Sequence, residues 1–308
     1  MSKSFEILRG WETGQIAAIL NKVSGGNRRK LEAILRDEAE VNLVDKIPKL
    51  FDKNGRRIPK DLQAAVCNSD KKFYLNQPEI KTVSDYANRL VRFQQAFNEG
   101  PVMSAAEFKG KSKKLISEIS ENKNLTNLLN GVFLPIILPK IDDFSDYGKI
   151  LEQVFLPAVK FAYEKEFPDR KFYNWRKDDL AGKVGIIEKT RHEKVVGKMT
   201  QGHIVAILFP NPLQGFSVFA SREQMSTLPK SILLVGGFDG TVAQAMYPDI
   251  LARDFNTPGY DLPAISWQSP DYSFNFKAND NRLNFDNRGD LGNANDNYSS
   301  GLLFLGSA

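Results

Sequence analysis

The chain has 308 residues, of which 42% are hydrophobic and 26% are charged, a composition typical of a globular protein rather than a disordered one. It holds one cysteine, Cys67, and two histidines, His192 and His203, which excludes an intrachain disulfide framework and argues against a multi-histidine zinc site. The net charge is +5, but residues 1–140 carry 24 Lys and Arg against 16 Asp and Glu, whereas residues 141–308 carry 18 against 21. The basic front half is consistent with an anionic partner or with a solvated helical face, and the absence of a long basic run favours the latter.

Neither a membrane span nor a secretion signal is expected. The longest apolar stretch, residues 132–138, is far shorter than the ~20 residues that a bilayer-spanning helix needs. The first residues of the chain lack the apolar segment of a secretory signal. We therefore expect no membrane partner and a cytoplasmic location.

The front half has the apolar spacing of amphipathic helices. Residues 12–23 place apolar side chains at positions 16, 19, 20 and 23, and Gly25-Gly26 is a typical helix end. Further helices are expected from residue 28, over 83–97 and over 104–129. Prolines exclude a helix over residues 132–139 and predict an extended segment there. We place a boundary in this region, between a basic helical domain of residues 1–140 and a second domain of residues 141–308.

The second domain has mixed patterns. A helix is expected over residues 147–167, capped by Ser145 and kinked at Pro157. Apolar runs of strand length follow at 184–187, 203–209, 216–219 and 231–235. Capping boxes starting at Ser221 and Thr241 predict two short helices. The fold class is therefore α+β: an N-terminal helical domain followed by a mixed α/β domain.

Residues 275–298 are the most unusual segment, with eight Asn and four Asp among 24 residues. Such a polar stretch is usually disordered. However, Phe276, Leu283, Phe285 and Leu291 recur inside it, and an apolar run at residues 302–305 reads as a buried closing strand. Polar loops held between apolar strands are typical of a binding surface, for which Asn and Asp supply hydrogen bonds and turns. An ordinary Asn-rich loop in a β-rich domain is the alternative interpretation.

Residues 281–288 and 293–298, followed by Gly301-Leu302-Leu303-Phe304, resemble the variable region of target proteins of diversity-generating retroelements. The resemblance implies a C-type-lectin-like fold for the second domain. It also implies a non-enzymatic protein that binds an unknown protein or surface ligand through a diversifiable, Asn-rich surface. The candidate ligand-binding residues are Asn279, Asn281, Asn284, Asp286, Asn287, Arg288, Asp290, Asn293, Asn295, Asp296, Asn297 and Tyr298, with Trp267 as a floor beneath them.

Calcium is a candidate cofactor of this segment. Asp286, Asp290, Asn293, Asn295 and Asp296 supply oxygen ligands, although their spacing is not that of an EF-hand loop. C-type-lectin-like domains sometimes hold calcium through such loops, so the resemblance keeps this cofactor open.

Two other functions remain open from the sequence. One is a hydrolase acting through Asp239 or Asp254, although nothing places two carboxylates at a defined separation. The other is a nucleic-acid-associated protein that uses the basic front half.

Three further segments carry weaker signals. Residues 170–177 interleave aromatic and basic side chains, which can stack on bases, but we favour packing of the three aromatic rings in the core. Gly236-Gly237 is expected to be a tight structural turn rather than an anion site. His192 is expected to be exposed, and His203 to lie in the core.

Overall fold

The computed structural model describes residues 12–41 and 49–306, and the chain divides into two compact units, Met1–Pro48 (unit 1) and Lys49–Ala308 (unit 2). The sequence-based boundary near residue 140 differs from this division. Phe93 and Phe108, which precede residue 140, lie in the same hydrophobic core as Phe238 and Phe304, which follow it. The physical reason is that the amphipathic helices of residues 83–121 bury their apolar faces against the β-rich part of the chain instead of against each other alone.

Unit 1 contains two short helices, α1 (Thr13–Ser24) and α2 (Arg28–Leu35). Gly25 ends α1 in the left-handed conformation (φ 61°), as the sequence predicts. The Asn27 side chain caps α2 by accepting a hydrogen bond from the Arg29 N–H. Among residues 12–41, only Ser24 is buried, so the described part of unit 1 has no hydrophobic core of its own.

Unit 2 starts with an irregular segment, and its first helices match the sequence pattern closely. They are α3 (Val83–Phe97), α4 (Ala105–Glu121) and the 3-10 helix η2 (Thr126–Asn130). Thr82 caps α3 by accepting a hydrogen bond from the Asp85 N–H. The helix expected over residues 104–129 ends early, because Asn122 adopts an extended conformation that interrupts it.

The helix expected over residues 147–167 is continuous but irregular. It comprises α5 (Tyr147–Ile150), the π-helical segment η3 (Leu151–Phe155) and α6 (Leu156–Glu166). Asp146, rather than the expected Ser145, caps it by accepting a hydrogen bond from the Lys149 N–H. The π-helical segment comes just before Pro157, where the missing proline N–H disturbs the regular hydrogen bonding.

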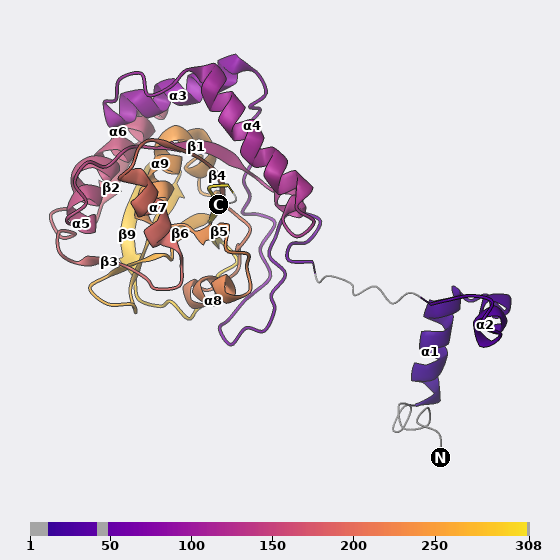
Figure 1. The fold of residues 1–308 in the computed structure, drawn as a ribbon. Coiled ribbons are helices and arrows are strands. Elements are labelled where there is room, and N and C mark those ends of the chain that lie inside the picture. Colours follow the sequence, from indigo (N-terminus) through magenta and orange to yellow (C-terminus); the bar gives the residue numbers. More distant parts are fainter. Residues whose placement is uncertain (1–11, 42–48, 307–308) are drawn as a thin grey trace. The chain divides into compact units, whose positions relative to one another are not determined.

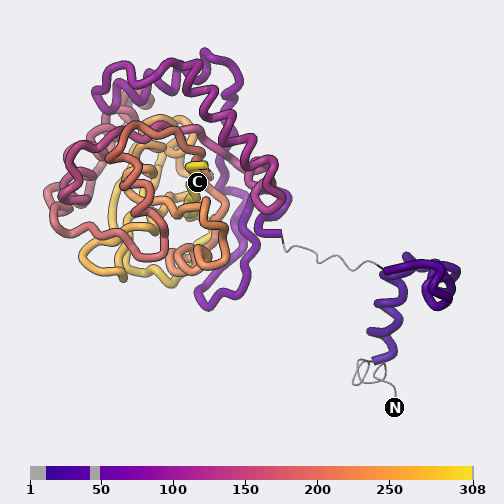
Figure 2. The backbone as a smooth tube through the Cα atoms, in the orientation of Figure 1, coloured from indigo at the N-terminus to yellow at the C-terminus, as the bar shows by residue number. Residues whose placement is uncertain are grey.

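Strands from distant parts of the chain form the central antiparallel sheet, sheet A. Its order is β1-β4-β11-β5. Its members are β1 (Leu134–Leu138), β4 (Ile204–Phe209), β11 (Leu302–Phe304) and β5 (Ile232–Leu234). All of β1, β5 and β11 is buried, which confirms the expected closing strand after the Asn-rich segment. Figure 2 shows this last part of the chain, in yellow, among segments from the middle of the sequence.

The second sheet, sheet B, contains the first half of the Asn-rich segment, which forms two strands instead of the expected loops, whereas residues 289–297 form a loop. Its order is β10-β6-β8-β9-β2. Its members are β10 (Tyr298–Ser300), β6 (Gly259–Leu262), β8 (Ser273–Asn279), β9 (Arg282–Arg288) and β2 (Lys171–Asn174). Strands β8 and β9 form an antiparallel hairpin, whereas β2 joins β9 in parallel from a position more than 100 residues earlier. A separate two-stranded sheet pairs β3 (Val184–Ile186) with β7 (Ile265–Trp267).

The remaining helices are α7 (His192–Met199), α8 (Val218–Glu223), the 3-10 helix η4 (Gln224–Ser226), α9 (Gly237–Met246) and α10 (Pro248–Leu251). Helix α9 is buried throughout. It packs against α6, α3 and β1, and α4 packs against β4. Figure 1 shows α3 and α4 covering one side of unit 2, with α6 beside them. The mixed α/β class is therefore confirmed, with α3 and α4 preceding the first strand and α5 to α10 lying between strands along the chain.

Three local expectations around α8 and α9 are wrong. Residues 216–219 form no strand, because the Ser217 hydroxyl accepts a hydrogen bond from the Ala220 N–H and starts α8 there. Ser221 therefore lies inside α8 and donates to the Ser300 hydroxyl. Thr241 likewise lies inside α9, which begins directly after Gly236. In the described ranges, no helix combines the length and apolar character needed to cross a bilayer.

Candidate ligand-binding surface

The alternation of side chains along β8 and β9 gives sheet B two different faces. Phe274, Phe276 and Ala278 of β8 are buried, and so are Leu283 and Phe285 of β9. The Phe285 ring stacks on Phe274, with 5.2 Å between centroids. Because successive side chains of a strand point to opposite faces, the residues between these belong to the other face of the sheet.

That other face is polar and hollowed. The register of the hairpin pairs Asn275 with Asp286 and Lys277 with Asn284. A depression of about 420 Å³, which we call the polar depression, opens over these strands. It is lined by Trp175, Asn275, Lys277, Arg282, Asn284, Asp286, Asn287, Arg288, Asp290, Asn295 and Tyr298. The lining contains aromatic rings, amides, cations and carboxylates, but no aliphatic side chain.

Arg288 organises one end of the polar depression. Its guanidinium bonds to the buried carboxylate of Asp261 at 3.4 Å and to Asp290 at 2.9 Å, and it lies over the Tyr298 ring at 5.0 Å. Burial raises the pKa of Asp261 to about 7, and the nearby Arg288 charge only partly opposes this rise. These contacts fix the arginine and the tyrosine ring in place before any ligand arrives.

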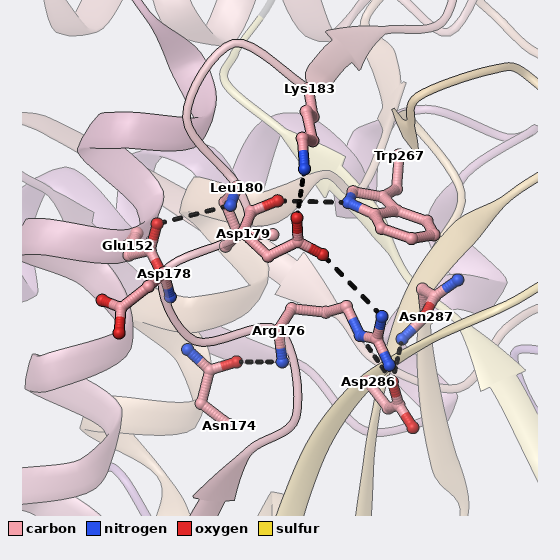
Figure 3. A network of polar contacts seen from close by, with 10 residues as sticks. All are labelled: Glu152, Asn174, Arg176, Asp178, Asp179, Leu180, Lys183, Trp267, Asp286 and Asn287. Carbon is pink, nitrogen blue, oxygen red and sulfur yellow. Dashed lines mark hydrogen bonds and ion pairs between the residues drawn. The ribbon is translucent and has the colours of Figure 1, made fainter.

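A second network holds the opposite side (Figure 3). Arg176, which follows β2, donates to Asp286 at 3.1 Å and lies over the Trp267 ring at 5.1 Å. Asp179 pairs with Lys183, and its backbone carbonyl accepts a hydrogen bond from the Trp267 indole at 3.3 Å. Trp267 thus supports Arg176 at the edge of the polar depression and does not form its floor.

Lys277 is the unusual cation of this surface. It is half-buried and its ammonium group lies near the rings of Phe73, Phe255 and Tyr298, at 5.0, 5.7 and 5.3 Å. Its hydrogen bond goes to the Thr257 carbonyl at 3.4 Å, and within the described residues it forms no ion pair with a carboxylate. Burial lowers the pKa of Lys277 to about 8.

Two exposed aromatic rings on the β2 side extend the surface. Tyr173 and Trp175 are 44% and 54% exposed, and their rings are stacked with centroids 6.1 Å apart. The Trp175 indole donates a hydrogen bond to Asn284 at 3.1 Å. Core packing of all three aromatic residues in 172–175 is therefore wrong: only Phe172 is buried. The alternation of β2 turns Tyr173 to the face opposite Phe172.

The thirteen predicted ligand-binding residues are all at least partly accessible. Seven line the polar depression: Asn284, Asp286, Asn287, Arg288, Asp290, Asn295 and Tyr298. Six lie outside its lining: Asn279, Asn281, Asn293, Asp296, Asn297 and Trp267. Among the latter, Asn281 and Asn297 contribute backbone carbonyls that accept hydrogen bonds from Lys171 and Gly259, so their local role is to pair strands.

Sequence reasoning missed four lining residues, namely Trp175, Asn275, Lys277 and Arg282. The alternation with buried Phe and Leu was a usable signal for the three in β8 and β9. Trp175 had no such signal, because it reaches the depression only through the parallel pairing of β2 with β9.

Two acidic residues of this segment are held by cations. Asp286 pairs with Arg176, and Asp290 pairs with Arg288. No group of three or more His, Cys, Asp and Glu side chains suited to a metal ion occurs in residues 12–41 and 49–306. The arrangement therefore lends no support to the calcium hypothesis.

The residues considered for hydrolysis have other surroundings. Asp239 is fully buried and accepts a hydrogen bond from the Gly236 N–H, which places it at the start of α9. Asp254 pairs with Arg253 at 2.8 Å. Burial raises the pKa of Asp239 to about 7, but a carboxyl shielded from solvent on all sides cannot meet a substrate in this conformation.

Next to Asp239 lies a buried polar cluster that anchors α9. The Tyr147 hydroxyl accepts the N–H groups of Gly237 and Phe238, at 2.9 and 3.1 Å, and lies 2.8 Å from His192 Nε2. This satisfies the helix start, so the glycine turn is structural, as expected. His192 is fully buried, contrary to its expected exposure, and burial lowers its pKa to about 3.

A larger depression of about 730 Å³ lies elsewhere in unit 2. It is lined by side chains between residues 52 and 77, by residues 130–132 and by Asn211. Two of its charged groups are bonded within the protein: Asp52 accepts the N–H groups of Asn54 and Arg56, and the Arg56 guanidinium donates to Gln214. It contains none of the Asn-rich residues. We therefore treat the polar depression as the candidate site.

Comparison with known proteins identifies no relative. No family model, no curated protein and no solved structure matches this chain. The function must therefore be argued from the polar depression itself.

Proposed function

We propose that this protein is a non-enzymatic binding protein whose ligand surface is the polar depression of sheet B and the loops around it. The observation that carries the proposal is the division of β8 and β9 into a buried, mainly aromatic face and a polar face, which is accessible along β9 and at Lys277, whereas Ser273 and Asn275 of β8 are buried. A surface of this kind can change its side chains while the packing beneath it stays the same. This is the property that a diversifiable binding surface needs.

The resemblance to retroelement target proteins adds two parts to the proposal. One is that residues 141–308 are C-type-lectin-like. The other is that the Asn codons of the variable region are the positions that undergo diversification. The DNA around the gene tests the second part. If these codons are diversified, that DNA should hold a near-copy of the codons for residues 279–298 that differs at adenines and lies beside a reverse-transcriptase gene.

A display library tests the binding function without knowledge of the natural ligand. The full chain is displayed on yeast with five positions randomised: Asn281, Asn284, Asn287, Asn293 and Asn295. The library is sorted against hen lysozyme as an arbitrary protein target. We expect most members to be displayed as folded protein and some to bind lysozyme in a clone-specific manner.

The matched control library randomises four inward-facing positions of the same strands: Phe274, Phe276, Leu283 and Phe285. We expect display to collapse, because these side chains form the core beneath the surface. Equal loss of display from both libraries would contradict the proposal, since it would mean that the Asn positions are needed for folding.

A further inference from the structure

The polar depression has a composition that restricts the chemistry of its ligand. The lining offers rings, amides and cations but no aliphatic side chain, so a ligand held there is recognised by hydrogen bonds, ring stacking and charge rather than by aliphatic packing. Its four amides come from Asn275, Asn284, Asn287 and Asn295. Asn275 is buried and the Asn284 amide is bonded to Trp175 and the Lys277 carbonyl, so Asn287 and Asn295 are the amides that can donate to and accept from a ligand. Such a lining suits a ligand that is itself polar and that carries rings.

The charges of the surface leave a place for an anion. Its carboxylates are already engaged, because Asp286 binds Arg176 and both Asp261 and Asp290 bind Arg288. Lys277 and Arg282 have no carboxylate partner within the described residues, and Lys277 is half-buried among rings. A desolvated, unpaired cation that lines an open depression favours a negatively charged group there.

The aromatic rings lie in line with that cation across the sheet. Tyr173 on β2 is paired with Asn284 on β9, which in turn is paired with Lys277 on β8. Since neighbouring strands are ~4.8 Å apart, Tyr173 lies on the order of 10 Å from Lys277. Farther along the sheet, the Tyr298 ring lies over Gly259. A Cβ atom on residue 259 would lie only 2.5 Å from this ring. Glycine therefore makes room for this ring.

We propose that this face of sheet B binds single-stranded nucleic acid, with phosphates at Lys277 and Arg282 and bases stacked on Tyr173 and Trp175. Sheets that bind single-stranded RNA stack two or three bases on exposed rings. Here both rings come from β2 and the residue after it, and Arg282 lies over the Tyr173 ring at 5.9 Å. A neutral carbohydrate would leave Lys277 unneutralised, and an acidic protein segment would supply charge but not the planar bases that extend a stack of exposed rings. The proposal rests on the proposed binding function and assigns its ligand class.

The test measures fluorescence anisotropy of labelled oligo-dT and oligo-U of about 12 nucleotides with the full chain at about 50 mM salt. We expect binding, and at least about tenfold weaker binding of a duplex of the same length, because paired bases cannot stack on the rings. The double variant Lys277→Gln/Arg282→Gln should weaken binding about tenfold or more. Tyr173→Ala and Trp175→Ala should each weaken it by about fivefold or more.

Matched controls separate this surface from general charge effects. Lys113→Gln/Lys114→Gln removes two exposed cations from α4, and Phe161→Ala removes an exposed ring from α6. Both should leave the affinity within about threefold of wild type. A melting temperature measured for every variant confirms that each is folded.

Three results would overturn the proposal. The first is that no oligonucleotide binds at this salt concentration. The second is that Lys113→Gln/Lys114→Gln weakens binding as much as Lys277→Gln/Arg282→Gln does. The third is that heparin also binds and that Tyr173→Ala and Trp175→Ala leave the affinity for both heparin and oligonucleotide unchanged. Heparin has charge but no bases, so the last result would indicate simple polyanion attraction. If the display library still yields folded lysozyme binders, only the ligand class has failed; if it does not, the binding surface itself has failed.

Discussion

The neighbouring residues Asn284 and Phe285 give the most direct test of the platform beneath the binding surface. Phe285 is fully buried, and its ring contacts Phe274 and Phe276 at centroid distances of 5.2 and 5.0 Å. Phe285→Ala removes these contacts and leaves a cavity, which costs about 3–5 kcal/mol of unfolding free energy. At about 2–4 °C per kcal/mol for a unit of this size, the melting temperature should fall by about 6–20 °C.

Asn284→Ser changes the adjacent position on the same strand but on the opposite face. It removes the hydrogen bond from Trp175, at 3.1 Å, and the weaker one to the Lys277 carbonyl, at 3.4 Å. Because these bonds are partly exposed to water, the loss should be about 1 kcal/mol, or about 2–4 °C.

The assay is urea denaturation of both variants and the wild type, followed by tryptophan fluorescence and circular dichroism, with calorimetry for the melting temperatures. The reasoning is refuted if the two substitutions cost similar free energies. A loss of less than about 1 kcal/mol of unfolding free energy for Phe285→Ala would also contradict the buried platform, because so small a loss is typical of an accessible side chain.

Three further predictions concern buried and charged groups. Tyr147→Phe removes the hydroxyl that accepts two buried backbone N–H groups of α9 and contacts His192. Calorimetry should show a loss of about 3 kcal/mol of unfolding free energy. An unchanged melting temperature would show that Tyr147 does not anchor α9. Because the pKa of Asp261 is raised to about 7, the folded protein retains a proton that the unfolded chain has released between about pH 4 and pH 7. The contribution of Asp261 to stability should therefore fall as pH rises through that window, and the difference in stability between wild type and Asp261→Asn should change by this amount in urea titrations. Because the pKa of Lys277 is about 8, oligonucleotide affinity should fall from about pH 7 to pH 9, and Lys277→Arg, which stays charged, should abolish that fall in anisotropy titrations.

Local patterns predicted much of the secondary structure because their causes are local. Helix α3 matches the predicted range, and Gly25 ends α1 in the left-handed conformation that glycine adopts readily. The errors arose where several local signals compete. Ser217 and Ser221 are both suitable residues to cap a helix. Ser217 caps α8 in the structure, whereas the Ser221 side chain is buried and donates a hydrogen bond to Ser300.

The domain boundary could not be predicted from local patterns. Prolines at 135 and 139 argue against a helix, but they do not distinguish a linker from a buried strand. In the structure the segment is β1, which pairs with β4 along its whole length. Its place in a central sheet depends on partners more than 60 residues away, which no local signal reports.

The recurrence of Phe276, Leu283 and Phe285 predicted correctly that the Asn-rich segment is ordered, because apolar side chains at short intervals are buried on folding. It did not predict that residues 273–288 form a strand hairpin instead of loops. Which strands pair with this hairpin depends on contacts between distant parts of the fold. The parallel pairing of β2 with β9 brings Trp175 to Asn284, and the pairing of β6 with both β8 and β10 brings Asp261 and Tyr298 to Arg288. Contacts between distant strands depend on the packing of the whole core, so the composition of the polar depression emerges only after the chain has folded.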